Sequence, residues 1–369
     1  MTTDPAAINH TPWWAWAAPL GACLLLAAKF SGIVPLAALA VLIPAALLLL
    51  ACVFAAVHHA EIVALRVGEP FGSIVLAVAV TVIEVALIVS MMLTAKDGGG
   101  ALARDTVFAA VMLVLNGVVG MCLVSGGARH REQVFQEQGA SAALSVLGTL
   151  AAITMILPNY TRATPGPLYA RPQLEFVGLV SLLLYGVFLF VQTVRHRDYF
   201  IAAVGPGDAD EHVEIQPSAR TTGISLCLLA VALAAVVLLA KTLSPSLEMA
   251  VASAGLPASF VGVVIAALVL LPEGIAAVAA ARANRLQTSL NLALGSAMAS
   301  IGLTIPTVAV VSIWMGQSLT LGLSPADMTL LILTLFISTV TLATGRTTIL
   351  QGAVHLVILG VFLLLSAMP

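Results

Sequence analysis

Two long apolar stretches of this sequence each contain a single charged residue, a glutamate near the middle. Residues 72–94 read GSIVLAVAVTVIEVALIVSMMLT, and the charge is Glu84. Residues 260–281 read FVGVVIAALVLLPEGIAAVAAA, and the charge is Glu273. A helix needs roughly 20 apolar residues to cross the hydrocarbon core of a bilayer. Both stretches therefore predict membrane-spanning helices that carry a carboxyl group at depth.

The composition of the whole chain points the same way. Of the 369 residues, 60% are hydrophobic and 9% are charged, and the mean hydropathy is +1.10. A soluble domain has about a quarter of its residues charged, so an ordinary soluble enzyme is excluded. The 15 basic and 17 acidic residues nearly cancel, which gives no basic excess for nucleic acid. The Ala/Val/Leu runs also lack the alternation of an outer-membrane barrel, so an all-α integral membrane protein is predicted.

Apolar runs between charged or Pro/Gly breaks predict eleven spans. Ten stay possible, because little more than Ser31 and Gly32 separates the first two runs. The predicted spans are Trp14–Ser31, Ile33–Val57, Gly72–Thr94, Thr106–Val124, Ser141–Leu157, Phe176–Val194, Thr222–Ala240, Phe260–Ala281, Asn291–Ile313, Met328–Leu342 and Thr347–Ala367.

The distribution of Lys and Arg predicts the orientation, since cytoplasmic loops carry an excess of both. With the N-terminus inside, the cytoplasmic loops hold nine such residues and the opposite loops hold five. The nine are Arg66, Arg129, Arg131, Arg195, Arg197, Arg220, Arg282, Arg285 and Arg346, and the five are Lys96, Arg104, Arg162, Arg171 and Lys241. A cytoplasmic N-terminus is therefore predicted.

Glu84 and Glu273 each lie 12 or 13 residues into a predicted span, about 18–20 Å at ~1.5 Å per residue and close to the midplane. A charge there costs at least ~2.5 kcal/mol, so such a residue is read as functional by default. The structural alternative is a carboxyl that is paired or permanently protonated. Pairing is disfavoured because no Lys or Arg lies near the middle of a predicted span, whereas protonation stays open.

The two halves of the chain match each other. If the first span is set aside, five spans precede the hydrophilic segment 195–220 and five follow it. An odd number of spans places the halves in opposite orientation, which is the inverted repeat common among secondary transporters. The predicted organisation is a tail and extra helix over 1–32, a first repeat over 33–194, a cytoplasmic acidic linker over 195–220 and a second repeat over 221–369.

Uncharged polar residues lie near both glutamates, on the same span or on the next one. Thr81 precedes Glu84 by three residues and shares its face, and the next span carries Asn116. The span after Glu273 carries Ser296 and Ser300, at i and i+4. These residues are predicted cation ligands, although small polar residues also occur at close helix contacts that bind nothing.

Charge balance suggests what such a site does. Two ionised carboxylates at the midplane repel in a poor dielectric, and protons or cations would neutralise them. Oxygen ligands suit Ca²⁺ or Na⁺. Proton and cation compete for the same oxygens, so the predicted function is cation/proton antiport without a resident cofactor. A channel is the less favoured alternative, and enzyme motifs of the HExxH and GxSxG types are absent.

The motifs around both glutamates resemble those of a known family. Gly68-Glu69-Pro70-Phe71-Gly72-Ser73, running into Thr81-Val82-Ile83-Glu84-Val85, resembles the first α-repeat of bacterial Ca²⁺/H⁺ antiporters in the calcium/cation antiporter superfamily. Pro272-Glu273-Gly274 and Asn291-Leu292-Ala293-Leu294-Gly295-Ser296 resemble the second α-repeat. The resemblance covers nearly the whole chain and is greatest for the branch described as sodium-potassium/proton and calcium/proton antiporters.

The resemblance implies two inverted five-helix repeats plus an extra helix in a bacterial inner membrane. It also implies that Glu84 and Glu273 exchange a cation for protons, with Ca²⁺, Na⁺ or K⁺ as cargo. Many members have Gly-Asn before each repeat glutamate, where this chain has Val80-Thr81 and Val269-Leu270, so Na⁺ or K⁺ remains an alternative to Ca²⁺. His355, eight residues into the last span, is a weaker candidate for proton transfer, and a hydrogen bond between helices is the favoured reading.

Overall fold

The computed structural model describes residues 11–32, 39–68, 71–94, 100–201 and 217–369. Within these residues, eleven helical segments are long and apolar enough to cross a membrane, which confirms the predicted all-α fold. Helices are the expected form because lipid offers no hydrogen-bond partner, so each backbone group must be satisfied within its own segment.

Contacts group the chain into two compact units. The first unit comprises Met1–Thr94 and Pro206–Ser253, and the second comprises Ala95–Gly205 and Ala254–Pro369. These two units are defined by which residues contact one another, whereas the predicted repeats are defined by the order and orientation of the spans. The repeat boundaries therefore stay a prediction. Four of the five acidic residues of the predicted linker (Asp208, Asp210, Glu211 and Glu214) lie outside the described residues, as do Glu69 and Pro70.

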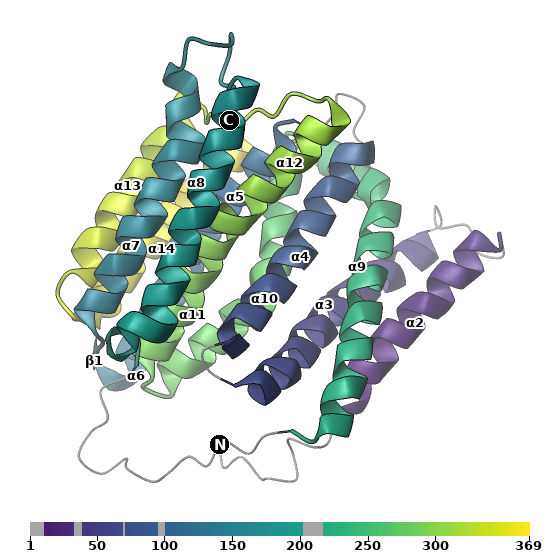
Figure 1. Ribbon diagram of the computed structural model, residues 1–369, viewed down its shortest axis with the longest axis horizontal. Coiled ribbons are helices and arrows are strands. Elements are labelled where there is room, and N and C mark those ends of the chain that lie inside the picture. The colour runs from purple at the N-terminus through teal and green to yellow at the C-terminus, as the bar shows by residue number, and fades with distance from the viewer. Residues whose placement is uncertain (1–10, 33–38, 69–70, 95–99, 202–216) are drawn as a thin grey trace. The chain divides into compact units, whose positions relative to one another are not determined.

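The first unit consists of helices α2 (Trp13–Phe30), α3 (Leu39–Val67), α4 (Phe71–Thr94) and α9 (Ala219–Ser253) (Figure 1). Helix α3 packs against the other three, and α4 also packs against α9. Two hydrogen bonds attach α2, one between His59 Nε2 of α3 and the carbonyl oxygen of Ala15 (3.1 Å) and one from Lys29 Nζ to Thr242 Oγ1 of α9 (2.9 Å). The predicted extra N-terminal helix is therefore built into this unit.

Helix α9 corrects one predicted boundary. The expected span ended at Ala240 and left Lys241 in a loop, but the helix continues to Ser253 and includes Lys241. Polar residues beyond Ala240 satisfy one another along the helix, as when Ser244 Oγ donates to Glu248 Oε1 at 3.2 Å. An apolar-run criterion stops at the first charge, whereas the backbone hydrogen-bond ladder does not.

The second unit holds the remaining helices and a short antiparallel ribbon (Figure 1). Its α-helices are α5 (Leu102–Met112), α6 (Val119–His130), α7 (Glu137–Ala151), α8 (Arg171–Phe190), α10 (Phe260–Arg282), α11 (Leu286–Ala299), α12 (Ile305–Met315), α13 (Pro325–Leu342) and α14 (Ile349–Ala367). Its π segments are η1 (Leu113–Val118), η2 (Ala152–Ile156), η4 (Val191–Arg195) and η6 (Ser300–Thr304), and its 3₁₀ turns are η3 (Leu157–Tyr160) and η5 (Arg197–Tyr199). Strands β1 (Glu132–Val134) and β2 (Arg346–Thr348) pair with Gln133 opposite Thr347.

Helix α10 lies parallel to the α5–η1–α6 segment along its whole length. Contacts at three successive levels show this: a Cβ at Gly262 would lie 2.9 Å from the backbone nitrogen of Thr106, a Cβ at Gly274 would lie 3.3 Å from Val118, and His130 Nε2 lies 3.0 Å from the carbonyl oxygen of Arg282. The close approach at Gly262 excludes a larger residue. This pair of segments forms the frame on which the polar residues of the second unit are arranged.

Candidate cation site

Glu84 lies in the first unit, as residue 14 of the 24 in α4. Its side chain is 4% exposed, on a helix that packs against both α3 and α9. Thr81 is 6% exposed and lies one turn earlier, and its hydroxyl donates to the carbonyl oxygen of Ala77 at 2.8 Å. That bond uses the Thr81 proton and leaves lone pairs on the oxygen, so the hydroxyl retains the capacity to bind a cation.

Glu273 lies in the second unit, as residue 14 of the 23 in α10. Its side chain is 7% exposed. The preceding Pro272 has no backbone N–H, so one carbonyl of the previous turn lacks its usual helical partner. The contact between Gly274 and Val118 places Glu273 at the level of η1, the segment that carries Asn116. The structure therefore brings two of the predicted site residues to one level of the second unit.

Asn116 is fully buried and hydrogen-bonded to residues of two other helices. Its Nδ2 donates to Thr334 Oγ1 of α13 at 3.0 Å, and its Oδ1 lies 3.2 Å from His355 Nδ1 of α14. His355 Nε2 lies 3.2 Å from Thr341 Oγ1, so both ring nitrogens have partners. His355 is thus hydrogen-bonded between helices, the reading that the sequence favoured, and one lone pair of the Asn116 amide oxygen remains for a cation.

The serines of α11 are turned toward α10. Ser289 Oγ donates to the carbonyl oxygen of Ala277 at 2.8 Å, which fixes that face of α11 against α10. Ser296 follows Ser289 by seven residues, about two turns, and therefore shares the face. Ser296 is partly buried, whereas Ser300 is 3% exposed and begins the π segment η6. Ser296 thus lies on a helix that packs against α10, the helix of Glu273, and Ser300 begins the segment that follows it.

The π segments are features that the sequence analysis missed. Asn116 lies within η1, and Ser300 lies within η6. A π segment changes the hydrogen-bond register of its helix, and such segments frequently occur at functional sites. Both contain a glycine, and a Cβ at Gly302 would lie 2.7 Å from the Cβ of Tyr185. The buried Asn-Gly pair and the Ser-x-Gly spacing were the available signals, but neither specifies a π turn.

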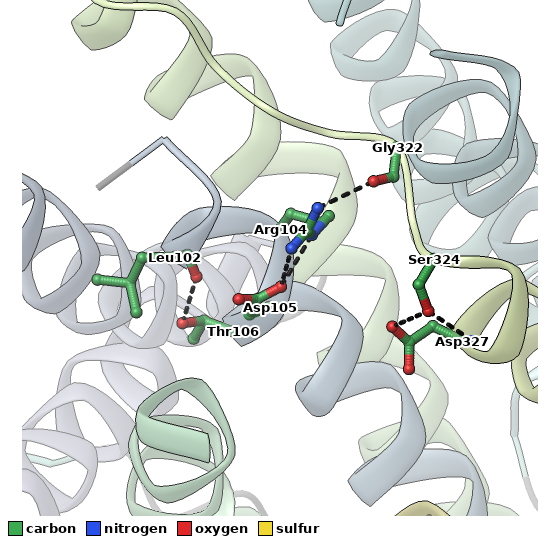
Figure 2. A network of polar contacts seen from close by, with 7 residues as sticks. All are labelled: Leu102, Arg104, Asp105, Thr106, Gly322, Ser324 and Asp327. Atoms are coloured by element: carbon green, nitrogen blue, oxygen red, sulfur yellow. Dashed lines mark hydrogen bonds and ion pairs between the residues drawn. The ribbon is translucent and has the colours of Figure 1, made fainter. Parts of the chain in front are cut away.

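One end of the second unit is held by a charged network (Figure 2). Arg104 pairs with Asp105 at 2.7 Å, and its Nη1 donates to the carbonyl oxygen of Gly322 at 3.0 Å. Ser324 caps α13 by accepting from the backbone N–H of Asp327, and its hydroxyl donates to the Asp327 carboxylate at 2.7 Å. Arg104 therefore ties the start of α5 to the segment that leads into α13.

A hydrogen bond from the Tyr169 side chain stabilises the same end of the second unit. Tyr169 Oη donates to the carbonyl oxygen of Ile153. Burial raises the pKa of Tyr169 from 10.0 to about 12, so the phenol stays protonated and keeps this bond well above neutral pH. The backbone N–H of Leu323 donates to the carbonyl oxygen of Met155 at 3.0 Å, which adds a second attachment of this connection.

The arrangement divides the predicted residues between the units. Glu84 and Thr81 lie in the first unit, and Glu273, Asn116, Ser296 and Ser300 lie in the second. Within each unit a nearly buried carboxyl is accompanied by neutral oxygens. Carboxylate, hydroxyl and amide oxygens are ligands of hard cations, and a carboxylate also binds protons, so each half can serve either species.

The proteins to which this chain is similar include named ion transporters. A protein of Sinorhizobium fredii named as the ionic transporter y4hA is 56% identical over 98% of this chain and 97% of its own length. The sodium-potassium/proton antiporter ChaA of Escherichia coli is 34% identical over 86% of each chain. The Ca²⁺/H⁺ antiporter of Aphanothece halophytica is 27% identical over 80% of this chain and 81% of its own.

Solved structures share the fold. The structure of native YfkE superposes with a TM-score of 0.74 at 16% identity, covering 96% of this chain and all (100%) of that one. The H⁺/Ca²⁺ exchanger CAX superposes with a TM-score of 0.69 at 16% identity, covering 98% of this chain and 87% of that one. The sequence model of the family described as sodium/calcium exchanger protein matches residues 37–194 and 224–368. This chain is therefore a multi-pass membrane protein of the sodium/calcium exchanger family, whose members are cation antiporters.

Proposed function

We propose that this protein exports a cation from the cytoplasm in exchange for protons by alternating access, with Glu84 and Glu273 binding cation and protons competitively. The observation that carries the proposal is the burial of both carboxyls, 4% and 7% exposed, near the middle of membrane-length helices. Thr81, Asn116, Ser296 and Ser300 supply further oxygens in the proposal. The N-terminus is cytoplasmic and the membrane is a bacterial inner membrane.

Competition follows from the energetics of a buried carboxyl. Desolvation disfavours the ionised form, so an empty site takes up protons, and a bound cation favours ionisation and expels them. Each carboxyl is then neutralised in turn by a proton or by its share of a cation. If the protein switches between its inward-open and outward-open states only when the site is neutralised, the cation flow and the proton flow are coupled. An empty charged site would be costly at that depth, which disfavours the switch without a bound cation or proton.

Ca²⁺ is the first candidate cargo, since two carboxylates balance its charge and its ligands are oxygens. Na⁺ or K⁺ is the second candidate. It is favoured by the 34% identity to ChaA and by Val80-Thr81 and Val269-Leu270 in the turns before the glutamates, which offer no asparagine oxygen. The same site would serve either cargo, with protons as the counter-ion.

The test uses purified protein in liposomes with an imposed proton gradient. Adding Ca²⁺, Na⁺ or K⁺ separately and following the lumenal pH identifies the exchanged cation. We expect Glu84→Gln and Glu273→Gln each to abolish exchange. Glu175→Gln is the control, because Glu175 lies in an exposed pair with Arg171. Full exchange by both site variants would refute the proposal, and a cation current independent of the proton gradient would indicate a channel.

A further inference from the structure

Thr304 carries a buried hydroxyl that the proposed site does not use. It is the last residue of η6 and is 0% exposed. Among the described residues, its Oγ1 has no hydrogen-bond partner. Buried polar atoms are nearly always satisfied, so an unsatisfied one indicates a strained position, a water or a bound ion.

The backbone turns Thr304 away from α8. Gly302 faces α8, because a Cβ there would meet Tyr185 at 2.7 Å. Thr304 follows two residues later, roughly half a helical turn, and so lies on the opposite face. Segment η6 also packs against α5, the helix that lies along α10. Thr304 therefore lies on the side of η6 that faces away from α8.

Helical spacing places Thr304 in line with the predicted serine ligands. Ser296, Ser300 and Thr304 are separated by four residues each, and side chains at that spacing lie on one face. Ser289, two turns before Ser296, fixes that face toward α10 through its bond to the carbonyl oxygen of Ala277. Thr304 thus extends the row of hydroxyl groups by one turn beyond Ser300.

Segment η1, the π segment that packs against α10, has no such unused group. In η1, Asn116 is bonded through its Nδ2 to Thr334 and through its Oδ1 to His355. That polar cluster satisfies itself within the protein. The Thr304 hydroxyl is equally buried but has no protein partner among the described residues, so its oxygen is available to a ligand.

We propose that Thr304 Oγ1 is an additional oxygen ligand of the transported cation, which it contacts next to Ser300 as the ion enters or leaves the site around Glu273. The inference rests on the proposed function. A cation that leaves water needs oxygens in place of its hydration shell, and a hydroxyl supplies one without adding charge. Thr304 would therefore act on cation affinity and selectivity, and the proton-binding carboxyls would remain unchanged.

The experiment compares variants at position 304 in the liposome exchange assay, with Ca²⁺, Na⁺ and K⁺ in turn. Thr304→Ala and Thr304→Ser differ by one hydroxyl and carry the comparison, and Thr304→Val tests removal of the oxygen at nearly constant volume. Thr307→Val is the matched control, because Thr307 is exposed and its hydroxyl donates to the carbonyl of Leu303 in its own helix.

We expect Thr304→Ala and Thr304→Val to raise the KM for the preferred cation by on the order of tenfold, the equivalent of one lost polar contact. Thr304→Ser and Thr307→Val should stay near the wild-type KM. Equal cation KM values in Thr304→Ala and Thr304→Ser would overturn the inference. If Thr304→Val lowered the melting temperature and left the cation KM unchanged, the hydroxyl would be assigned to a buried water and the inference would fail. Should Glu84→Gln and Glu273→Gln both keep full exchange, the proposed function fails. Should both variants lose exchange while the Thr304 variants are unaffected, only this inference fails.

Discussion

Replacing Asn116 with leucine should destabilise the second unit, because its amide joins three segments. The variant removes the bond to Thr334 at 3.0 Å and the bond to His355 at 3.2 Å, in a side chain that is 0% exposed. A hydrogen bond contributes about 0.5–1.5 kcal/mol in soluble proteins and about 0.6 kcal/mol on average between membrane helices. Two lost bonds, and two partners left unsatisfied, give an expected loss of about 1–3 kcal/mol.

A double-mutant cycle with His355→Leu isolates the Asn116–His355 bond. Both single variants and the double variant are unfolded by SDS titration in mixed micelles, and their free energies of unfolding are compared. Because the two residues share one bond, the double variant should lose less than the sum of the single variants, by roughly 0.6 kcal/mol. Thr307→Val serves as the control, since its hydroxyl bonds its own helix at an exposed position.

The result that refutes this reasoning is additivity within about 0.3 kcal/mol, the behaviour of independent sites. The same variants also test the ligand role of the amide oxygen. If that oxygen binds the cation, Asn116→Leu raises the cation KM in the exchange assay, and His355→Leu does so much less. Equal KM values in wild type and Asn116→Leu, with the stability loss present, would restrict Asn116 to positioning the helices.

Two further changes probe the frame of the second unit. Gly352→Ala should cost about 1–3 kcal/mol of stability through overpacking, because the new Cβ would lie 2.7 Å from the backbone nitrogen of Val124. Gly360→Ala is the control on the same helix, because a Cβ there would have nothing within 4 Å, and it should be neutral or stabilise by up to ~1 kcal/mol. Equal free energies of unfolding for the two glycine variants would contradict the packing. Arg104→Gln should cost about 1–3 kcal/mol, because it breaks a half-buried ion pair and a bond to a carbonyl oxygen. Arg171→Gln is the control, because the exposed i,i+4 ion pair of Arg171 contributes only about 0.3–0.5 kcal/mol. Equal melting temperatures for the two arginine variants would refute the larger contribution expected of Arg104.

The sequence predicted the number and approximate position of the spans because the criterion is local. A run of about 20 apolar residues has to be a helix in lipid, whatever surrounds it. The same reasoning isolated Glu84 and Glu273, whose cost at the midplane does not depend on knowing their neighbours. It placed the end of α9 too early, at Ala240 instead of Ser253, since polar residues at i and i+4 continue that helix.

Side-chain partners were decided by the tertiary structure. Asn116 meets Thr334 and His355, which lie 218 and 239 positions away, and sequence spacing relates only residues within about a turn of each other. The π segments that carry Asn116 and Ser300 were not predicted, because neither the Asn-Gly pair nor the Ser-x-Gly spacing specifies a π turn. Thr304 shows the difference most directly. In the sequence it is one threonine among many. The structure shows that its hydroxyl is buried and has no protein partner among the described residues. Burial and hydrogen-bond partners depend on which helices pack together, and the sequence alone does not show that.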